Sequence, residues 1–130
     1  MVGIVLVSHH NKIAEGLLEL ASQMGGQDVK IMAAGGLEDG AIGTDAVRIS
    51  QAVTAAYSGD GVVILADLGS AVLSSETALE FLEEAIREKV RIADAPFVEG
   101  AIAATVQASI GATLDEVVAV AEQARELHKC

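Results

Sequence analysis

The sequence is poor in the residues that build covalent cross-links and stacking surfaces. Its one cysteine, Cys130, is the last residue, which excludes an internal disulfide and a cysteine-based metal cluster. It has no tryptophan, one tyrosine and two phenylalanines (Tyr57, Phe81 and Phe97), so a base or a sugar finds few rings to stack on. A small chemical group or a protein partner is therefore expected in place of a large organic ligand.

Basic residues and long apolar runs are also scarce. The chain has 8 Lys and Arg against 19 Asp and Glu, and a net charge of -11 repels nucleic-acid backbones and anionic lipid surfaces. No apolar run approaches the roughly 18 to 20 residues of a membrane span, and the N-terminus lacks a basic region followed by an apolar signal core. We expect a soluble, cytoplasmic protein without nucleic-acid or membrane partners. Its 130 residues predict one domain, residues 1–130.

Short apolar segments alternate with segments of helical spacing. Residues 2–7, 29–33, 61–66 and 89–92 are predicted strands, and the nearly continuous apolar character of the first and third is typical of strands buried on both faces of a parallel sheet. The clearest helical stripe is formed by Ile13, Leu17, Leu20 and Met24.

Four further helices are predicted. The second runs from Thr44, as its N-cap, to about Tyr57, and the third covers about 71–87 with Leu79, Leu82 and Ile86 on one stripe. A shorter helix covers about 102–109. The last begins at Thr113, which forms a capping-box signature with Glu116, and continues to about Leu127.

This alternation predicts an α/β fold: a small, doubly wound, mainly parallel β-sheet flanked by helices, with right-handed crossovers. In such sheets the first strand commonly lies beside the third, and the winding reverses between them. The loops that leave these two strands then face one crevice. The first loop carries Ser8, His9 and His10, and the third strand ends in "ADLGSA", residues 66–71.

These loops carry the parts of a phosphoryl-transfer site. One nitrogen of a neutral imidazole can attack phosphorus while the other holds a proton and donates it to a carboxylate. Asp67 is placed to accept that hydrogen bond and to stabilise the positive ring that forms. Gly69 and Ser70 open the third helix, so their backbone N–H groups and the helix dipole can hold phosphoryl oxygens.

Other interpretations of the same residues stay open. A histidine at a strand end is commonly a partly exposed loop residue, and an aspartate before glycine is commonly a turn former. Metal binding by His9 and His10 is a weaker hypothesis, because adjacent side chains on a strand point to opposite faces. The glycine-bearing segment 33–46 matches no phosphate-binding fingerprint, but it follows the second strand and can form a rim of the crevice.

Several motifs resemble those of one known family. "VSHHNKIAEG", "IGTDA", "DLGSAVLSSETALE" and "PFVEGAIAATVQAS" occur in this order. They are similar to segments of the phosphotransferase subunit of phosphoenolpyruvate-dependent dihydroxyacetone kinases, a relative of the mannose-type IIA domains of the bacterial sugar phosphotransferase system. The resemblance extends from Val2 to about Leu127.

The resemblance implies a homodimeric phosphoryl carrier. A histidine would accept the group from the phosphocarrier protein HPr and pass it to ADP held by the nucleotide-binding subunit of the kinase. In this family the active histidine follows the serine that ends the first strand, which indicates His9. Counting back from Glu15 as in mannose-type IIA domains indicates His10 instead. We expect His9 to be the active histidine, with His10 as the second candidate. We expect no cofactor and no metal on the chain, and a donor supplied as a separate protein.

Two other functions are weighed against this one. A IIA component of a mannose-type sugar transporter would use the same histidine but deliver the group to a IIB domain. A receiver-like regulatory domain would be phosphorylated on Asp67 and would need an acidic pair after the first strand to hold magnesium, where "SHH" stands instead. The motifs "DLGSA" and "PFVEG" favour the dihydroxyacetone kinase branch.

Overall fold

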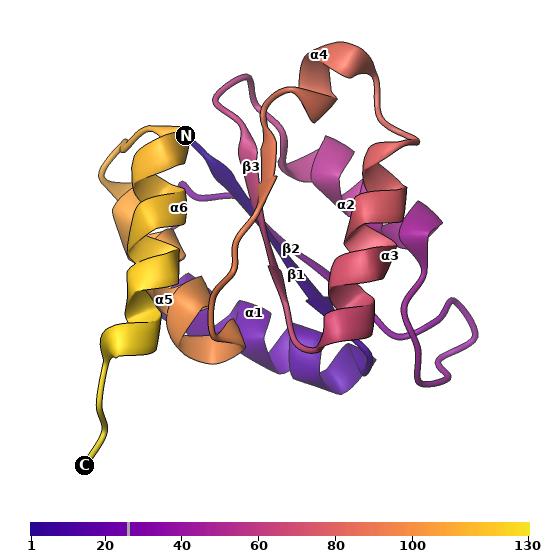
Figure 1. The fold of residues 1–130 in the computed structure, drawn as a ribbon, viewed down its shortest axis with the longest axis horizontal. Coiled ribbons are helices and arrows are strands. Elements are labelled where there is room, and N and C mark those ends of the chain that lie inside the picture. Colours follow the sequence, from indigo (N-terminus) through magenta and orange to yellow (C-terminus); the bar gives the residue numbers. More distant parts are fainter. Residues whose placement is uncertain (26) are drawn as a thin grey trace.

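The computed structural model describes residues 1–25 and 27–130 as a four-stranded sheet with helices on both faces (Figure 1). The strands are β1 (Gly3–Ser8), β2 (Ile31–Gly35), β3 (Val62–Ala66) and β4 (Val90–Ile92). The α-helices are α1 (Asn11–Gly25), α2 (Ala46–Ala56), α3 (Gly69–Leu79), α4 (Glu84–Arg87), α5 (Phe97–Ser109) and α6 (Leu114–Gln123), and a 3-10 turn, η1, covers Ala124–Glu126.

The strand order is β2-β1-β3-β4, and each neighbouring pair is parallel. The chain therefore winds outward from β1 to β2, crosses back to β3 and continues to β4, which confirms the doubly wound α/β class. It also confirms that β1 lies beside β3, with Val7 of β1 opposite Ala66 of β3. The winding reverses between these two strands, so their carboxyl ends open into the same space.

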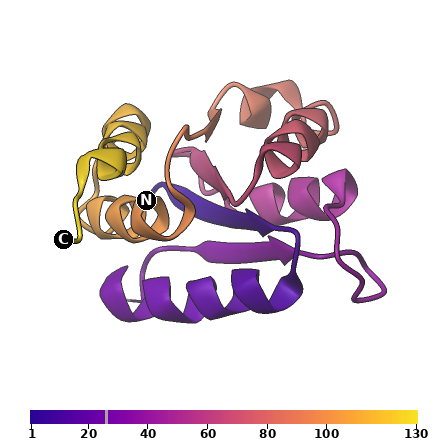
Figure 2. The same ribbon diagram turned by 60° about the horizontal axis from the view of Figure 1, so that its bottom comes forward.

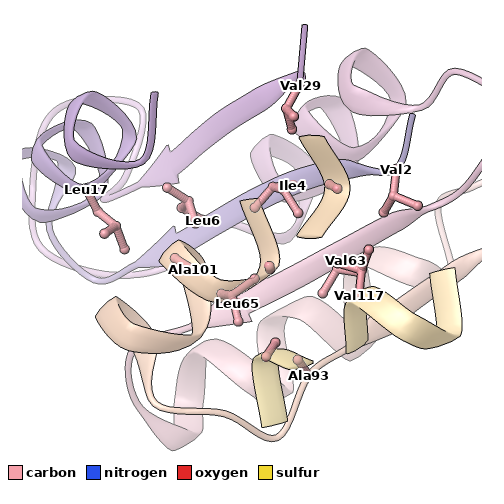
Figure 3. Close-up of a cluster of buried hydrophobic side chains, with 13 residues drawn as sticks. Val2, Ile4, Leu6, Leu17, Val29, Val63, Leu65, Ala93, Ala101 and Val117 are labelled. Carbon is pink, nitrogen blue, oxygen red and sulfur yellow. The ribbon is translucent and has the colours of Figure 1, made fainter. Parts of the chain in front are cut away.

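The sheet separates two apolar cores. Every residue of β1 is buried, and its side chains alternate between the faces because successive Cβ atoms of a strand point in opposite directions. Ile4 and Leu6 pack with residues of α1, α5 and α6 (Figure 3), whereas Val5 and Val7 pack with residues of α2 and α3. In Figure 2, β1 and β2 lie between α1 on one side and α2 on the other.

The first helix is where the sequence placed it, but most of its apolar stripe does not enter the core. Leu17 is 5% exposed, whereas Ile13, Leu20 and Met24 are 51%, 47% and 55% exposed. Small residues make up the rest of the buried side of α1: Ala14, Ala21 and Gly25. Because these residues have short side chains or none, α1 can lie close to its neighbours: Ala14 faces Gly35 of β2, and Gly25 faces Thr105 of α5.

Two predicted helices differ from the structure near their ends. The N-cap of α2 is Asp45 and not Thr44: Oδ1 of Asp45 accepts hydrogen bonds from the N–H groups of Val47 (2.9 Å) and Arg48 (3.4 Å). The predicted helix 71–87 is interrupted after Leu79. Three successive i→i+3 hydrogen bonds tighten the chain there, and α4 then leads into β4.

The break keeps the predicted apolar stripe buried. Leu82 lies in the break and is 6% exposed, and Leu79 and Ile86 pack on the same core. Tightening the chain at this point keeps Leu82 on the core while the chain returns to pair Val90 with Val62 of β3.

The two C-terminal helices also differ from their predicted limits. The fifth helix begins at Phe97, directly after Pro96, and not near residue 102. Gly100 hides this start in the sequence, because glycine is a weak helix former. It is used here for close packing: a Cβ at this position would lie 2.9 Å from Cβ of Ala95. The capping box of Thr113 and Glu116 is confirmed, but α6 ends at Gln123 and a 3-10 turn follows in place of helix to Leu127.

No helix in the described part of the chain is both long and apolar enough to cross a membrane.

Candidate active site

The last residue of β1 begins a tight arrangement of polar groups at the carboxyl edge of the sheet. Ser8 is fully buried, and His9 and His10 form the turn between β1 and α1. The turn passes close to the end of β2, because a Cβ on Gly35 would lie 2.8 Å from Cβ of Ala14, Cα of Asn11 and the carbonyl oxygen of His10. A glycine at this position lets the strand end approach the first turn of α1.

Asp67, directly after β3, is the centre of this arrangement. Its Oδ2 accepts hydrogen bonds from Oγ of Ser8 (2.9 Å) and the backbone N–H of His9 (3.0 Å). Its Oδ1 contacts Nδ1 of His9 (2.9 Å) and accepts a bond from the N–H of Leu68 (2.7 Å). Burial raises the pKa of Asp67, but these hydrogen bonds from His9, Ser8 and Leu68 outweigh it and lower the pKa below its ordinary value of 3.8.

The hydrogen bonds of His9 define which of its ring nitrogens has a free electron pair. An ionised carboxylate only accepts, so Nδ1 carries the hydrogen that Asp67 receives. In the neutral ring, Nε2 is then an acceptor, and the Oγ of Ser70 lies against it as a hydrogen-bond donor. The His9 side chain is 22% exposed and that of Asp67 is 13% exposed. His9 thus presents Nε2 at the surface while the partly buried carboxylate orients the ring.

His10 accepts hydrogen bonds from the first turn of α1 and makes none to Asp67. Its Nδ1 accepts a hydrogen bond from the backbone N–H of Lys12 (3.0 Å), and its carbonyl oxygen accepts from the N–H groups of Ile13 and Ala14 (3.2 Å each). These are the bonds of an N-cap residue at the start of α1. Because a backbone N–H only donates, the neutral His10 ring carries its hydrogen on Nε2. The two adjacent histidines therefore hold opposite tautomers.

The predicted anion cradle lies beside Nε2 of His9. Gly69 and Ser70 are the first residues of α3, which confirms that they open this helix. Leu68 is the N-cap and supplies no side-chain hydrogen bond to the helix. The first N–H groups of a helix lack intrahelical partners and carry the positive end of the helix dipole, so this end of α3 can accept phosphoryl oxygens.

The loop between β2 and α2 forms a rim, as segment 33–46 suggested. The N–H of Gly43 donates to the carbonyl oxygen of His9 (2.8 Å), and Oγ1 of Thr44 lies 2.6 Å from Oγ of Ser74 on α3. Nη1 of Arg48 donates to three carbonyl oxygens at the start of the loop, those of Gly35, Gly36 and Leu37, at 3.2, 3.3 and 2.9 Å. The loop is thereby attached to both the turn that carries His9 and α3.

Several of these roles have weak signals in the sequence. Ser8, the cap made by His10 and the loop anchor Arg48 were not predicted as parts of the site. The serine and the arginine are polar residues inside or beside apolar segments, which is compatible with many roles. A histidine one residue before a helix is a recognisable cap position only when the helix start is known.

Within residues 1–25 and 27–130, no group of three or more histidine, cysteine, aspartate or glutamate side chains is arranged to hold a metal ion.

The site and the sheet together define a class of protein. A histidine with a carboxylate on one ring nitrogen and a helix N-terminus at the other can act as a nucleophile toward phosphorus and hold the product. It lies at the switch point of a doubly wound sheet, where such folds bind their ligands. The family model described as "PTS system fructose IIA component" matches residues 3–118.

Curated relatives narrow this class. The chain is 47% identical over 97% of its length to the phosphoryl donor subunit DhaM of PEP-dependent dihydroxyacetone kinase from Escherichia coli, and 45% identical over 95% to that of Providencia stuartii. It spans 27% of the length of each. A DhaM subunit of kinase 2 from Listeria innocua is 44% identical over 90% of this chain and 94% of its own length. The chain belongs to the fructose IIA component family and, within it, to the DhaM subunits.

Solved structures agree with the fold. The crystal structure of EF1359, a protein of unknown function, matches with a TM-score of 0.84 at 37% identity over 95% of both chains. The phosphotransferase system component EIIA from Streptococcus agalactiae matches with a TM-score of 0.69 at 15% identity, over 97% of this chain and 93% of that one. The second likeness concerns the fold alone and confirms the mannose-type IIA architecture expected from the resemblance.

Proposed function

We propose that this chain carries a phosphoryl group on Nε2 of His9, which it accepts from phospho-HPr and delivers to ADP bound to the nucleotide-binding subunit of dihydroxyacetone kinase. The observation that carries the proposal is the pair of bonds on the His9 ring. The hydrogen bond from Nδ1 to Asp67 leaves the electron pair of Nε2 directed at Ser70 and the start of α3. The opposite tautomer of His10 commits its Nδ1 pair to the helix cap.

The proposed transfer moves the phosphoryl group in two balanced steps. The electron pair of Nε2 attacks phosphorus, the N–P bond of the donor phosphohistidine breaks, and its electrons return to the donor ring. The His9 ring then carries a positive charge, which Asp67 stabilises through Nδ1–H without taking the proton. In the second step an oxygen of the ADP β-phosphate attacks phosphorus, the His9 N–P bond breaks, and ATP forms on the kinase subunit.

The partners follow from the names of the relatives and from the resemblance. The relatives are called phosphoryl donor subunits of PEP-dependent dihydroxyacetone kinases, and one from Lactococcus lactis is called PTS-dependent. Both descriptions favour a phosphocarrier donor and a kinase acceptor. On the resemblance we also propose a homodimer, which sedimentation equilibrium measures directly.

The test is intact-mass analysis after incubation with phosphoenolpyruvate, enzyme I and HPr. We expect one phosphoryl group per chain, labile in acid and stable in base, as a phosphoramidate is. His9→Ala should gain none, and fragmentation under neutral conditions should locate the group of the wild type on His9. His10→Asn is the matched control, because asparagine is also a good N-cap. A group found on His10, or an acid-stable adduct, contradicts the proposal.

Adding a IIB domain or the ADP-loaded kinase subunit to this experiment separates the two alternatives. Transfer to a IIB domain but not to ADP on the kinase subunit would indicate a sugar-transporter component. A group on Asp67 would indicate a receiver-like domain. The geometry does not favour a group on Asp67, because each of its two oxygens already accepts two hydrogen bonds.

A further inference from the structure

Ser8 is the one polar residue of β1. It is the last residue of β1, it is fully buried, and the five residues before it in the strand are Gly3, Ile4, Val5, Leu6 and Val7. A buried hydroxyl costs free energy unless it is hydrogen-bonded, so its partners indicate why a serine is there.

The hydroxyl of Ser8 connects the backbone N–H of His10 to Asp67. Its oxygen accepts a hydrogen bond from the backbone N–H of His10 (3.1 Å), and it donates to Oδ2 of Asp67 (2.9 Å). A serine hydroxyl has one hydrogen to donate. Because the carboxylate only accepts, that hydrogen is directed at Asp67, and the two bonds in series polarise each other.

The four donors to Asp67 are not equivalent. Two of them, the N–H groups of His9 and Leu68, belong to the backbone and are fixed by the fold. The third is Nδ1–H of the His9 ring, which takes part in the reaction. Ser8 is the fourth: a side chain that holds Oδ2 and touches no reacting atom. The last torsion of an aspartate side chain is broad, so the carboxylate plane depends on such bonds.

We propose that Ser8 is a positioning residue for phosphoryl transfer, whose hydroxyl fixes the carboxylate of Asp67 and thereby keeps the His9 ring in its Nδ1–H tautomer. The proposal rests on the function proposed above and adds the group that prepares the nucleophile. With Oδ2 held, Oδ1 faces Nδ1 and the Nε2 electron pair stays available. Without the hydroxyl, Oδ2 keeps one donor, the carboxylate plane turns, and the tautomer with hydrogen on Nε2 becomes populated. That tautomer has no electron pair for phosphorus at Nε2.

The test compares Ser8→Ala with Ser75→Ala. Ser75 is the matched control because it too is fully buried and donates one hydrogen bond, to the carbonyl oxygen of Ala71 within α3 (2.7 Å), away from Asp67. Both variants lose one buried hydroxyl. Ser8→Cys keeps the volume with a weak donor and serves if the alanine variant does not fold. Two quantities are measured: the ¹⁵N shifts of the His9 ring, which report the tautomer, and the rate of phosphorylation by phospho-HPr.

We expect Ser8→Ala and Ser8→Cys to show the Nε2–H tautomer of His9 and to accept the phosphoryl group about 10-fold more slowly, since hydrogen bonds to charged groups are among the stronger ones. Ser75→Ala should keep the wild-type spectrum and rate. On an Asp67→Asn background, Ser8→Ala should slow the reaction no further, because both residues act through one carboxylate.

Unchanged His9 shifts and rate in folded Ser8 variants, or an equal loss in Ser75→Ala, would overturn the role of Ser8. A wild-type chain that gains no phosphoryl group would overturn the proposed function itself. The ring spectrum, which needs no donor protein, distinguishes these failures.

Discussion

The two edges of the parallel sheet carry hollows of nearly equal volume but very different chemistry. At the carboxyl edge, a hollow of about 390 Å³ is lined by residues that include Asp67 and Gly69. At the amino edge, one of about 400 Å³ is lined by residues that include Met1, Asp60 and Lys89. The volume of a hollow therefore does not show which edge is functional.

The difference lies in how the polar groups are held. The Met1 ammonium and Asp60 form an ion pair of 2.6 Å at the amino edge, but the Asp60 side chain is 63% exposed. Asp67 at the carboxyl edge is 13% exposed and accepts four hydrogen bonds, two from the backbone N–H groups of His9 and Leu68 and two from the side chains of Ser8 and His9. Water competes freely at the first carboxylate and poorly at the second, so the same residue type serves two purposes.

The largest effect is expected from Asp67→Asn. The amide can still pair with the His9 ring but cannot stabilise the positive charge, so we expect phosphorylation to slow by about two to four orders of magnitude, as for the carboxylate of a serine-hydrolase triad. Rapid-quench kinetics with phospho-HPr measures this. A rate within a few-fold of wild type would remove Asp67 from the mechanism.

Asp67→Asn should also change how the free energy of unfolding depends on pH. Because the pKa of Asp67 is lower in the folded chain than its ordinary value of 3.8, the ionised group stabilises the fold above that pH. This contribution is lost as the pH falls through the folded pKa. The difference in unfolding free energy between wild type and Asp67→Asn should therefore be constant near neutrality and shrink below pH about 4. A difference that grows in acid contradicts the direction of the shift.

The next largest effect is expected from Gly35→Ala. The added Cβ meets two backbone atoms of the His10–Asn11 turn at 2.8 Å, and backbone cannot move aside as a flexible side chain does. We expect a loss of about 1–3 kcal/mol in unfolding free energy and slower phosphorylation, because the turn carries His9. Urea unfolding and the transfer rate measure the two effects.

Gly16→Ala is the matched control for this prediction. Gly16 is an exposed residue of α1 with nothing within 4 Å of the added Cβ. Alanine there should stabilise the helix by up to about 1 kcal/mol and leave transfer unchanged. Equal behaviour of the two variants would show that the approach of β2 to α1 is not tight.

A smaller effect is expected from the cap of α1. His10→Ala removes the Nδ1 acceptor of the Lys12 N–H and should cost about 1 kcal/mol of stability, whereas His10→Asn should restore most of it. Both variants should still be phosphorylated. Thermal unfolding with a transfer assay measures both properties. Equal stability of the alanine and asparagine variants would exclude the capping role.

The sequence predicted the sheet and the central pair of the site for physical reasons that also explain its errors. Continuous apolar strands and helical stripes indicate which segments are buried. Buried parallel strands in turn predicted that the loops carrying His9 and Asp67 lie close together. Helix limits depend on single hydrogen bonds. The sequence therefore predicted Thr44 as a cap where the structure has Asp45, and it missed the i→i+3 hydrogen bonds that interrupt the helix after Leu79. Gly100 concealed a helix start because its packing against Ala95 is a tertiary contact.

The assignment of tasks to the adjacent histidines was open in the sequence for a related reason. His9 and His10 have the same chemistry, and only the groups opposite their ring nitrogens distinguish them. A carboxylate faces one Nδ1 and a backbone N–H faces the other. Neither neighbour follows from local spacing: Asp67 is 58 residues from His9, and the N–H of Lys12 matters only once α1 begins at Asn11.

The smallest effect is expected from Asp60→Asn, the same aspartate-to-asparagine change made at the amino edge of the sheet. Asp60→Asn removes the ion pair with the Met1 ammonium, whose hydrogen bond lowers the pKa of Asp60. Exposed pairs contribute little to stability, because water solvates both charges and salt screens them. We expect an unchanged urea midpoint at physiological salt and an unchanged rate of phosphorylation. If Asp60→Asn slowed transfer as Asp67→Asn is expected to, the amino edge would be part of the phosphoryl site, and the contrast between a solvated and a partly buried carboxylate would not support the proposed site at the carboxyl edge.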